Sequence, residues 1–338
     1  FILYFGSYLI VSSQGTAFGV GQLSSLITYG FLMLMALMML SFVFAMIIIA
    51  EEGARRICEV LLATSTINNP ENPLTEVTDG SIDFENVGFS YSGPEGREAL
   101  SDVDLHINSG EVIGIIGGTG SAKSTLVQLI PRLYDVTAGS VSVGGHDVRD
   151  YDIDTLRGAV AMVLQKNVLF SGTIKENLLW GNPDATDEEI LEAARLAQAD
   201  SFVQTFPDKY ETHIEQGGNN VSGGQKQRLC IARALIRRPK VLILDDSTSA
   251  VDTKTDSLIR SGLKDFLPDT TKIIIAQRTS SIEESDKIIV LDNGRINAIG
   301  THKELLKDNP IYREVYFSQN KQSVDENQSQ EGEVTSHE

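Results

Sequence analysis

The first fifty residues of this chain of 338 contain no aspartate, glutamate, lysine or arginine. The first charged side chain is that of Glu51, so the formal net charge of −18 at pH 7 belongs wholly to residues 51–338. Nucleic-acid-binding proteins gain affinity from a basic surface, which an acidic chain of this kind lacks. We therefore expect no nucleic acid among its partners.

Cysteine is nearly absent as well. The chain has only Cys58 and Cys230, and neither lies in a spacing typical of a metal site. Unpaired thiols suit a reducing compartment. We expect both side chains to serve packing rather than redox chemistry, because a free cysteine usually behaves as a small apolar residue.

The uncharged N-terminal part of the chain contains long apolar runs. Residues 1–11 are apolar, residues 12–22 are small and polar, and residues 23–50 form a second apolar run. This second run exceeds the roughly 20 residues that cross a bilayer as a helix. A secretory signal begins with basic residues and has a shorter apolar core, and a buried globular helix of this length normally keeps a polar face. The sequence therefore predicts a membrane-spanning helix.

Two arginines, Arg55 and Arg56, follow the second run within a few residues. Basic residues collect at the cytoplasmic ends of membrane spans, so this end is expected in the cytoplasm and residues 12–22 outside. The chain starts without methionine inside an apolar run, which suggests that further spans precede it. We expect residues 1–67 to be the end of a multi-pass domain in the cell membrane.

The composition changes after the membrane segment. Residues 68–80 hold two prolines and several turn-forming residues, and are predicted to be a linker. Residues 81–318 show the patterns of strands and helices, among them half-buried strands at 82–89 and 100–107. Residues 319–338 are rich in Gln, Ser, Glu and Asn, and are predicted to be disordered.

Two local signals mark element boundaries within the globular part. Thr186 precedes an acidic segment with apolar residues at helical spacing, and is a candidate N-cap. Asn293 and Gly294 lie between two short apolar runs, which is the usual sequence of a tight hairpin.

A buried-strand run at residues 111–117 leads into a glycine-rich segment and then a helix that begins near Lys123. This nearly matches the phosphate-binding sequence G-x-x-x-x-G-K-[ST] in the strand–loop–helix context that it requires. Small residues let backbone N–H groups approach phosphates, and the helix N-terminus adds its positive end. Lys123 would reach the outer phosphates and Ser124 would bind Mg²⁺. The nucleotide-binding residues expected here are Gly117, Gly118, Thr119, Gly120, Ser121, Ala122, Lys123, Ser124 and Thr125.

Three further motifs lie downstream of the glycine-rich segment. Gln165 ends an apolar run and is predicted to sense Mg²⁺ and nucleotide, although an ordinary surface residue would fit the same pattern. Ser222 is a candidate N-cap before two glycines that open a helix. Asp245 and Asp246 end the apolar run Val241–Leu244, which is typical of a core strand that delivers a carboxylate to Mg²⁺. The alternative is a capped strand end.

Together these motifs resemble those of the ATP-binding cassette (ABC) transporters, specifically exporters that fuse membrane and nucleotide-binding domains in one chain. The resemblance implies an α/β P-loop cassette with a RecA-like core, an antiparallel β subdomain and a helical signature subdomain, preceded by transmembrane helices. It implies that ATP and Mg²⁺ bind, with Tyr91 stacked on adenine and with metal contacts from Ser124, Gln165 and Asp245. Ser249–Asp252 would be the D-loop.

In this family two cassettes pair head to tail, and each ATP lies between the phosphate loop of one chain and the signature of the other. The resemblance therefore implies that the signature of this chain acts on the ATP of a partner. The residues of that signature are Val221, Ser222, Gly223, Gly224 and Gln225.

Three residues depart from the family's pattern around the γ-phosphate. Ala122 replaces the usual Gly before the lysine, Asp246 replaces the catalytic Glu, and Gln277 replaces the switch His. The Asp carboxylate would sit about 1 Å or more further back than that of Glu, and such a displacement costs on the order of 100-fold in rate. Gln cannot become a cation. The catalytic positions Asp246 and Gln277 therefore predict a site that holds ATP but hydrolyses it slowly.

A degenerate site beside an intact signature resembles one subunit of the heterodimeric bacterial multidrug exporters. That resemblance implies a second ABC half-transporter as partner, a lipid bilayer, and an exported small molecule, lipid or peptide. Two alternatives stand beside it. The cassette could be an ATP-gated regulatory or channel half with negligible hydrolysis, or a soluble ABC ATPase of DNA repair or translation. The uncharged N-terminal run argues against the second alternative.

Overall fold

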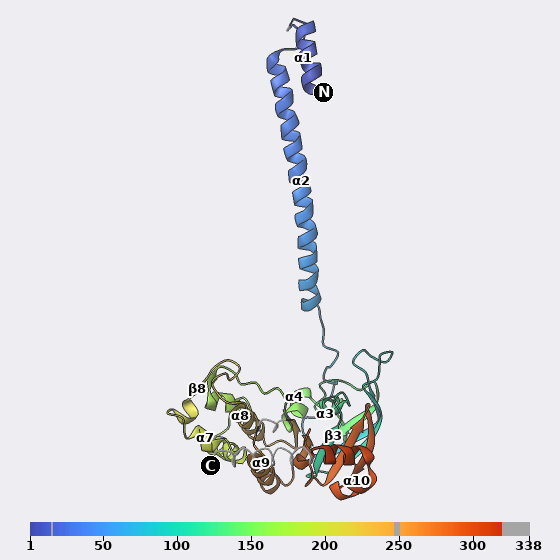
Figure 1. Cartoon of the computed structure of the whole chain (residues 1–338), viewed down its shortest axis with the longest axis vertical. Helices are drawn as coiled ribbons and strands as arrows, with labels where there is room; N and C mark the ends of the chain where they lie inside the picture. Colours follow the sequence, from blue (N-terminus) through green and yellow to red (C-terminus); the bar gives the residue numbers. More distant parts are fainter. Residues whose placement is uncertain (15, 247–250, 320–338) are drawn as a thin grey trace, which may run out of the picture. The chain divides into compact units, whose positions relative to one another are not determined.

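The computed structural model describes residues 1–14, 16–246 and 251–319. The chain divides into two compact units, Phe1–Thr66 and Ile67–Glu338 (Figure 1). Two residues of the predicted D-loop, Ser249 and Ala250, and the predicted tail beyond Gln319 lie outside the described residues.

The first unit consists of two helices, α1 (Ile2–Ser12) and α2 (Val20–Leu61). With 42 residues, α2 is about 63 Å long, which exceeds the ~30 Å of a bilayer's hydrocarbon core. It is the one helix of the described residues that is long and apolar enough to cross a membrane, and none of its apolar window is buried. Its last turns are charged, and there Arg55 pairs with Glu52 and Glu59 across single helical turns.

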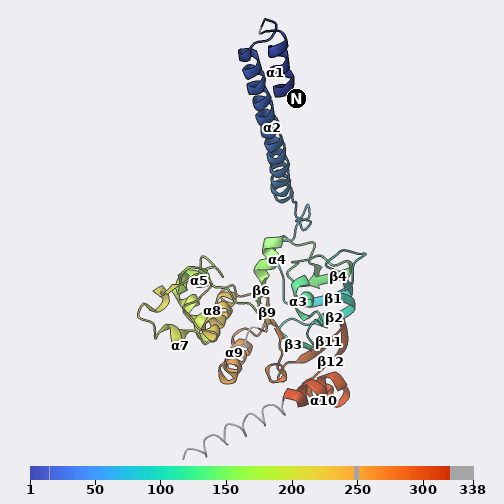
Figure 2. The same cartoon turned by 45° about the horizontal axis from the view of Figure 1, so that its top comes forward.

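An antiparallel sheet lies at one side of the second unit (Figure 2). Both strands predicted from alternating patterns, 82–89 and 100–107, form with these bounds. Its spatial order is β2-β1-β4-β5. The strands are β1 (Ile82–Phe89), β2 (Leu100–Ile107), β4 (Ala138–Val143) and β5 (His146–Asp147).

The larger sheet has the order β12-β11-β3-β10-β9-β6, and all its neighbours are parallel except β11 and β12. Asn293 and Gly294 turn the chain between these two strands with positive φ angles of 47° and 78°, so the predicted hairpin is confirmed. The strands are β3 (Val112–Gly117), β6 (Val160–Val163), β9 (Val241–Asp245), β10 (Thr271–Ile275), β11 (Lys287–Asp292) and β12 (Arg295–Gly300).

Both faces of the parallel strands are buried, which explains why they read as unbroken apolar runs. In β10, Ile274 packs into one core cluster while Ile273 and Ile275 pack into the other. Alternate side chains of a strand point to opposite faces, so the sheet separates two hydrophobic cores. The strands therefore form a rigid base for the residues that follow their carboxyl ends.

Helices surround the larger sheet, and Figure 2 shows α5, α7 and α8 grouped away from the antiparallel strands. Thr186 caps α6 and Ser222 caps α8 with reciprocal side-chain bonds, as predicted. The helices are α3 (Lys123–Leu129), α4 (Ile153–Ala159), α5 (Ile174–Leu179), α6 (Asp187–Leu196), α7 (Asp200–Val203), α8 (Gly223–Leu235), α9 (Thr253–Phe266) and α10 (His302–Asp308). Shorter elements are β7 (Gly172–Thr173), β8 (His213–Ile214) and the 3-10 turns Lys209–Glu211 and Thr279–Ser281, and residues 310–319 are helical.

Candidate functional site

The predicted phosphate loop connects the end of β3 to the start of α3. The Lys123 ammonium donates hydrogen bonds to the carbonyl oxygens of Gly117 at 2.8 Å and Gly118 at 2.9 Å. Burial lowers the pKa of this ammonium, whereas the charges of Asp245 and Asp246 act in the opposite direction. The lysine thus holds the loop in shape and lies within the field of both carboxylates.

Two positions of the loop restrict which residues fit. A Cβ at Gly117 would come within 2.2 Å of the Leu291 carbonyl oxygen, so only glycine can end β3 here. Ala122 caps α3 in the left-handed conformation, with φ 71° and ψ 24°. A residue with a side chain pays about 1–2 kcal/mol to adopt that conformation. The departure at position 122 therefore strains the backbone at the start of α3.

Tyr91, the predicted adenine-stacking residue, is held by neighbours on the antiparallel sheet and beyond α3. Its ring meets the edges of Phe89 and Tyr134 at centroid distances of 4.8 Å and 5.2 Å. Its hydroxyl lies 3.0 Å from the Thr125 hydroxyl, within hydrogen-bond range. Tyr91 as a whole residue is 57% exposed, so it is accessible to a ligand. Sequence reasoning missed Tyr134, whose only local signal is its position shortly after the helix.

The carboxyl ends of three parallel strands bring together three of the predicted site residues. Gln165 follows β6, Asp246 follows β9 and Gln277 follows β10. The Gln165 amide donates to Asp246 Oδ2 at 3.1 Å, and the Gln277 amide donates to the same oxygen at 2.7 Å. The carboxylate of Asp246 therefore accepts from both glutamines.

The location of Asp246 directly after the end of β9 changes both its backbone conformation and the pKa of its carboxyl group. Asp246 adopts a positive φ of 47°, and its amide donates to the Ile275 carbonyl of the adjacent strand at 2.9 Å. Burial raises the pKa of its carboxyl group, and the like charge of Asp245 acts in the same direction. The two glutamine amides and Lys123 oppose that shift because they favour the charged form.

The loop that carries Gln277 is fastened by the last described residue. The Gln319 side-chain amide donates to the Gln277 carbonyl at 2.7 Å, and its oxygen accepts from the Thr279 amide at 2.9 Å. These bonds fix the backbone of the switch position from the C-terminal helix. Sequence reasoning placed Gln319 at the start of a disordered tail and gave no sign of this contact.

The predicted metal ligands offer oxygen atoms, which are the ligands that Mg²⁺ prefers. Ser124 lies in the first turn of α3, Asp245 ends β9, and Gln165 lies beside Asp246. The described residues contain no cluster of three His, Cys, Asp or Glu side chains that could hold a metal ion by themselves, so further ligands would have to come from the nucleotide. The residues present therefore fit a magnesium ion held jointly with a nucleotide.

The predicted signature lies apart from the phosphate loop. Ser222 Oγ accepts from the Gln225 amide at 3.3 Å, and the Ser222 amide donates to Gln225 Oε1 at 2.9 Å. Both views place α8, which carries Gly223 and Gly224, well away from α3 (Figures 1 and 2). The predicted signature and the phosphate loop therefore lie on different parts of the nucleotide domain.

Comparisons with known proteins identify a matching family and relatives of this chain. Residues 100–249 match the family described as ABC transporter. An uncharacterised ABC transporter ATP-binding protein of Mycobacterium tuberculosis is 43% identical over 323 residues, which cover 94% of this chain and 54% of the relative. A putative multidrug export ATP-binding/permease protein of Staphylococcus aureus is 44% identical over 245 residues, 72% of this chain and 42% of that protein.

A solved structure is also similar. The structure of a bacterial Atm1-family ABC exporter with ATP bound aligns with a TM-score of 0.75 at 31% identity, over 94% of this chain and 55% of that one. The chain thus spans about half the length of the curated relatives that it matches. The predicted α/β P-loop cassette is confirmed by these matches.

The strain at Ala122 predicts that glycine changes the stability of the protein in opposite directions at position 122 and at an ordinary helical position. Replacing Ala122 with Gly should stabilise the protein by up to about 1 kcal/mol, because relief of the left-handed strain exceeds the entropy that glycine adds to the unfolded chain. Ala194→Gly, at a fully buried position in the last turn of α6, should destabilise it by about 1 kcal/mol or more. Denaturant unfolding of the purified protein measures both. Equal destabilisation by the two variants would show that position 122 carries no strain.

The raised pKa of Asp246 predicts a pH dependence of stability. Folding favours the protonated carboxyl, so this contribution is complete below the ordinary pKa of 3.8 and is lost as the pH rises through the raised value. Asp246→Asn cannot ionise. The stability of the wild type relative to this variant should therefore fall as the pH rises above about 4 and through the raised pKa, as measured by denaturant unfolding.

The matched control for this pH series is Asp292→Asn, at the exposed end of β11. This variant measures how the loss of one exposed aspartate carboxylate changes stability with pH. A constant or growing advantage of the wild type over Asp246→Asn with rising pH would contradict the raised pKa.

Proposed function

Because the chain contains an ABC transporter ATP-binding domain and has exporter relatives, we propose that it is one subunit of an ATP-driven exporter. In this proposal its own site binds ATP and hydrolyses it slowly. Its signature completes a second, faster site on a partner cassette. The observation that carries the proposal is the position of Asp246, whose carboxylate accepts from Gln165 and from Gln277, an amide that cannot become a cation.

ATP binding is assigned to groups from both sheets. Tyr91 offers an exposed ring for adenine. The loop Gly117–Thr125 offers small residues and the α3 N-terminus to the phosphates, with Lys123 available once it leaves its carbonyl partners. A magnesium ion held by Ser124, Asp245 and Gln165 would neutralise charge on the phosphates.

Slow hydrolysis follows from the groups around the γ-phosphate position. A general base must reach the attacking water within hydrogen-bond distance. The Asp246 side chain is one methylene shorter than the glutamate it replaces, and its Oδ2 already accepts two amide donors. Gln277 can donate a hydrogen bond but supplies no positive charge as phosphoryl transfer proceeds. These features favour a site that retains ATP.

The partner is proposed from the geometry of the signature. Ser222–Gln225 forms a complete capping box at the start of α8, and this helix lies apart from the phosphate loop. A signature that lies on a different part of the domain from the phosphate loop suits contact with a nucleotide on another cassette. Three departures on one side and an intact motif on the other favour a heterodimer over a homodimer.

The membrane part is proposed from α2 and the relatives. We assign residues 1–67 to the end of a multi-pass transmembrane domain in the cell membrane and residues 81–318 to a cytoplasmic nucleotide-binding domain. Residues 68–80, predicted to be a linker, are assigned to a connecting segment that is fastened to this domain, and residues 319–338 to a tail. The relative described as a putative multidrug export protein supports a small molecule as cargo, and a lipid or a peptide is proposed from the family resemblance alone.

Contact with the membrane domain is proposed at a groove of about 330 Å³ beside the Gln165 loop. Its lining includes the exposed apolar side chains of Leu164, Val168, Phe170 and Trp180. The Phe170 and Trp180 rings lie 4.8 Å apart, which gives the groove an aromatic wall. Movement of Gln165 on nucleotide binding would thus shift the residues that line this groove, where a membrane-domain segment docks. Transport then follows because ATP binds the closed pair of cassettes better than the open pair.

Restoring the two family residues should speed hydrolysis. Asp246→Glu combined with Gln277→His should raise the ATPase rate of the full-length protein alone on the order of 10- to 100-fold, because the carboxylate regains its reach and the imidazole can carry charge. Phosphate release measures the rate. Asp208→Glu, in the exposed turn before the 3-10 segment Lys209–Glu211, is the matched control.

Two outcomes would count against the proposal. Brisk hydrolysis by the unmodified protein alone would show that its own site is competent. Failure of vanadate to trap nucleotide in the complex with the partner would instead favour an ATP-gated regulator without pumping.

A further inference from the structure

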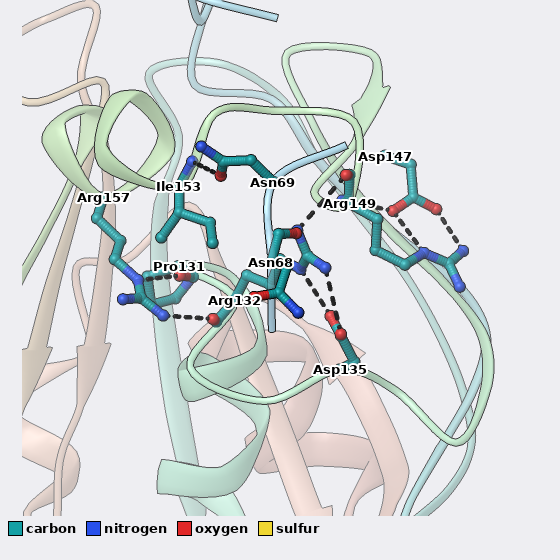
Figure 3. Close-up of polar contacts among 9 residues, drawn as sticks. All are labelled: Asn68, Asn69, Pro131, Arg132, Asp135, Asp147, Arg149, Ile153 and Arg157. Carbon is teal, nitrogen blue, oxygen red and sulfur yellow. Dashed lines mark hydrogen bonds and ion pairs between the residues drawn. The ribbon is translucent and has the colours of Figure 1, made fainter. Parts of the chain in front are cut away.

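A buried arginine joins the start of the nucleotide domain to the turn that follows α3 (Figure 3). Arg132 is 6% exposed. Its Nε donates to Asp135 Oδ1 at 2.7 Å, and its Nη1 donates to the carbonyl oxygen of Asn68 at 3.2 Å. A guanidinium can hold a carboxylate and a carbonyl together because its donors form a rigid fork.

The turn around Arg132 is fixed from a second direction. Arg157 of α4 donates to the carbonyl oxygens of Pro131 at 3.3 Å and Arg132 at 2.9 Å. Arg132 also adopts a positive φ of 50°, a conformation that a residue with a long side chain keeps only when its surroundings enforce it. The turn is therefore held in one shape rather than free to adapt.

The segment that reaches Arg132 is itself fastened to the domain. The Asn69 side-chain amide donates to Asp152 Oδ1 at 2.6 Å, and its oxygen accepts from the Ile153 amide at 2.9 Å at the start of α4. Further along, Leu74 forms an isolated parallel bridge with Tyr151. Residues 68–74 thus behave as part of the nucleotide domain, although their composition predicts a plain linker.

The other side of the same turn reaches the adenine-stacking residue. Tyr134, two residues after Arg132, places its ring edge against Tyr91 at 5.2 Å between centroids. Tyr91 is in turn bonded to Thr125 of the phosphate loop. One short turn therefore contacts the proposed adenine site at Tyr134 and the incoming chain at Arg132.

We propose that Arg132 is a positioning residue that couples nucleotide occupancy to the helix preceding the domain. Nucleotide contact at Tyr91 and the phosphate loop shifts the turn after α3, and Arg132 carries that shift to Asn68. Residues 62–67 then connect Asn68 covalently to the end of α2. This inference rests on the proposed function, since it assumes that ATP drives movement of the membrane helices.

The chain carries a reporter position for this coupling. Cys58 is exposed near the end of α2, whereas Cys230 is buried. A nitroxide attached to Cys58 in the full-length complex, with cysteines outside this chain replaced by serine, reports movement of the helix end when ATP is added. Binding of a fluorescent ATP analogue and transport are measured on the same preparation.

The test variant is Arg132→Lys. Lysine keeps a positive charge beside the half-buried Asp135 carboxylate, so this carboxylate stays paired, but a single ammonium cannot also hold the Asn68 carbonyl as the guanidinium does. The ATP-induced spectral change at Cys58 should fall on the order of 5-fold or more, with ATP affinity within about twofold of the wild type. Asn69→Ala, which releases the same segment from α4, should act in the same direction.

The matched control is Arg149→Lys. The Arg149 side chain lies in the same region and pairs only with Asp147 among the described contacts. This variant should keep the full spectral change. A merely structural role of Arg132 would lower protein yield or stability but leave the ATP response of the folded fraction intact.

The outcomes separate this inference from the proposed function. If the wild type responds to ATP and Arg132→Lys responds equally, the coupling role of Arg132 is wrong while the exporter proposal stands. If the wild type binds ATP without any change at Cys58, the coupling route is wrong as well. If the wild type binds no ATP, the proposed function itself fails.

Discussion

The parallel register of the larger sheet determines how the site is assembled. Pairing of Ile275 with Asp245 and of Val163 with Leu244 sets the carboxyl ends of β10, β9 and β6 level with one another. The same edge receives β3, whose end opens the phosphate loop. Four segments that are distant in sequence therefore deliver their next residues to one place. Because both faces of the sheet are buried, this edge cannot shift without disturbing two cores.

In the structure, the groups that would contact a nucleotide are already engaged with one another. Lys123 bonds to carbonyls of its own loop, and Gln165 and Gln277 both bond to Asp246. Nucleotide binding must exchange these bonds for contacts to phosphate and magnesium. The net free energy of binding is therefore the difference between the new contacts and the hydrogen bonds that are lost. The same exchange frees Gln165 to move beside the groove that we assign to the membrane domain.

Residues with strong local signals were predictable from the sequence. The bounds of β1 and β2, the caps at Thr186 and Ser222, and the Asn293–Gly294 hairpin follow from alternation, capping and turn chemistry within a few residues. The phosphate loop was equally clear because its strand, glycines and helix are contiguous.

Contacts between distant segments were not predictable in the same way. Neither the positive φ of Asp246 nor the packing of Tyr134 on Tyr91 leaves a local pattern. The bonds from Gln319 to the Gln277 loop join positions far apart in the chain. The prolines near Asn69 indicate a turn-rich segment, but composition cannot show that Asn69 bonds to the start of α4. Such contacts depend on tertiary packing, which a single sequence does not record.

The central proposal is that the carboxylate of Asp246 activates water poorly for attack on the terminal phosphoryl group, so that this site hydrolyses ATP slowly. The most direct measurement is the identity of the nucleotide retained at this chain's phosphate loop while the complex turns over, found by acid quenching and chromatography of the bound fraction. The account predicts intact ATP at this loop through many turnovers at the partner's site. Conversion of that bound ATP to ADP at the overall rate of the complex would contradict it.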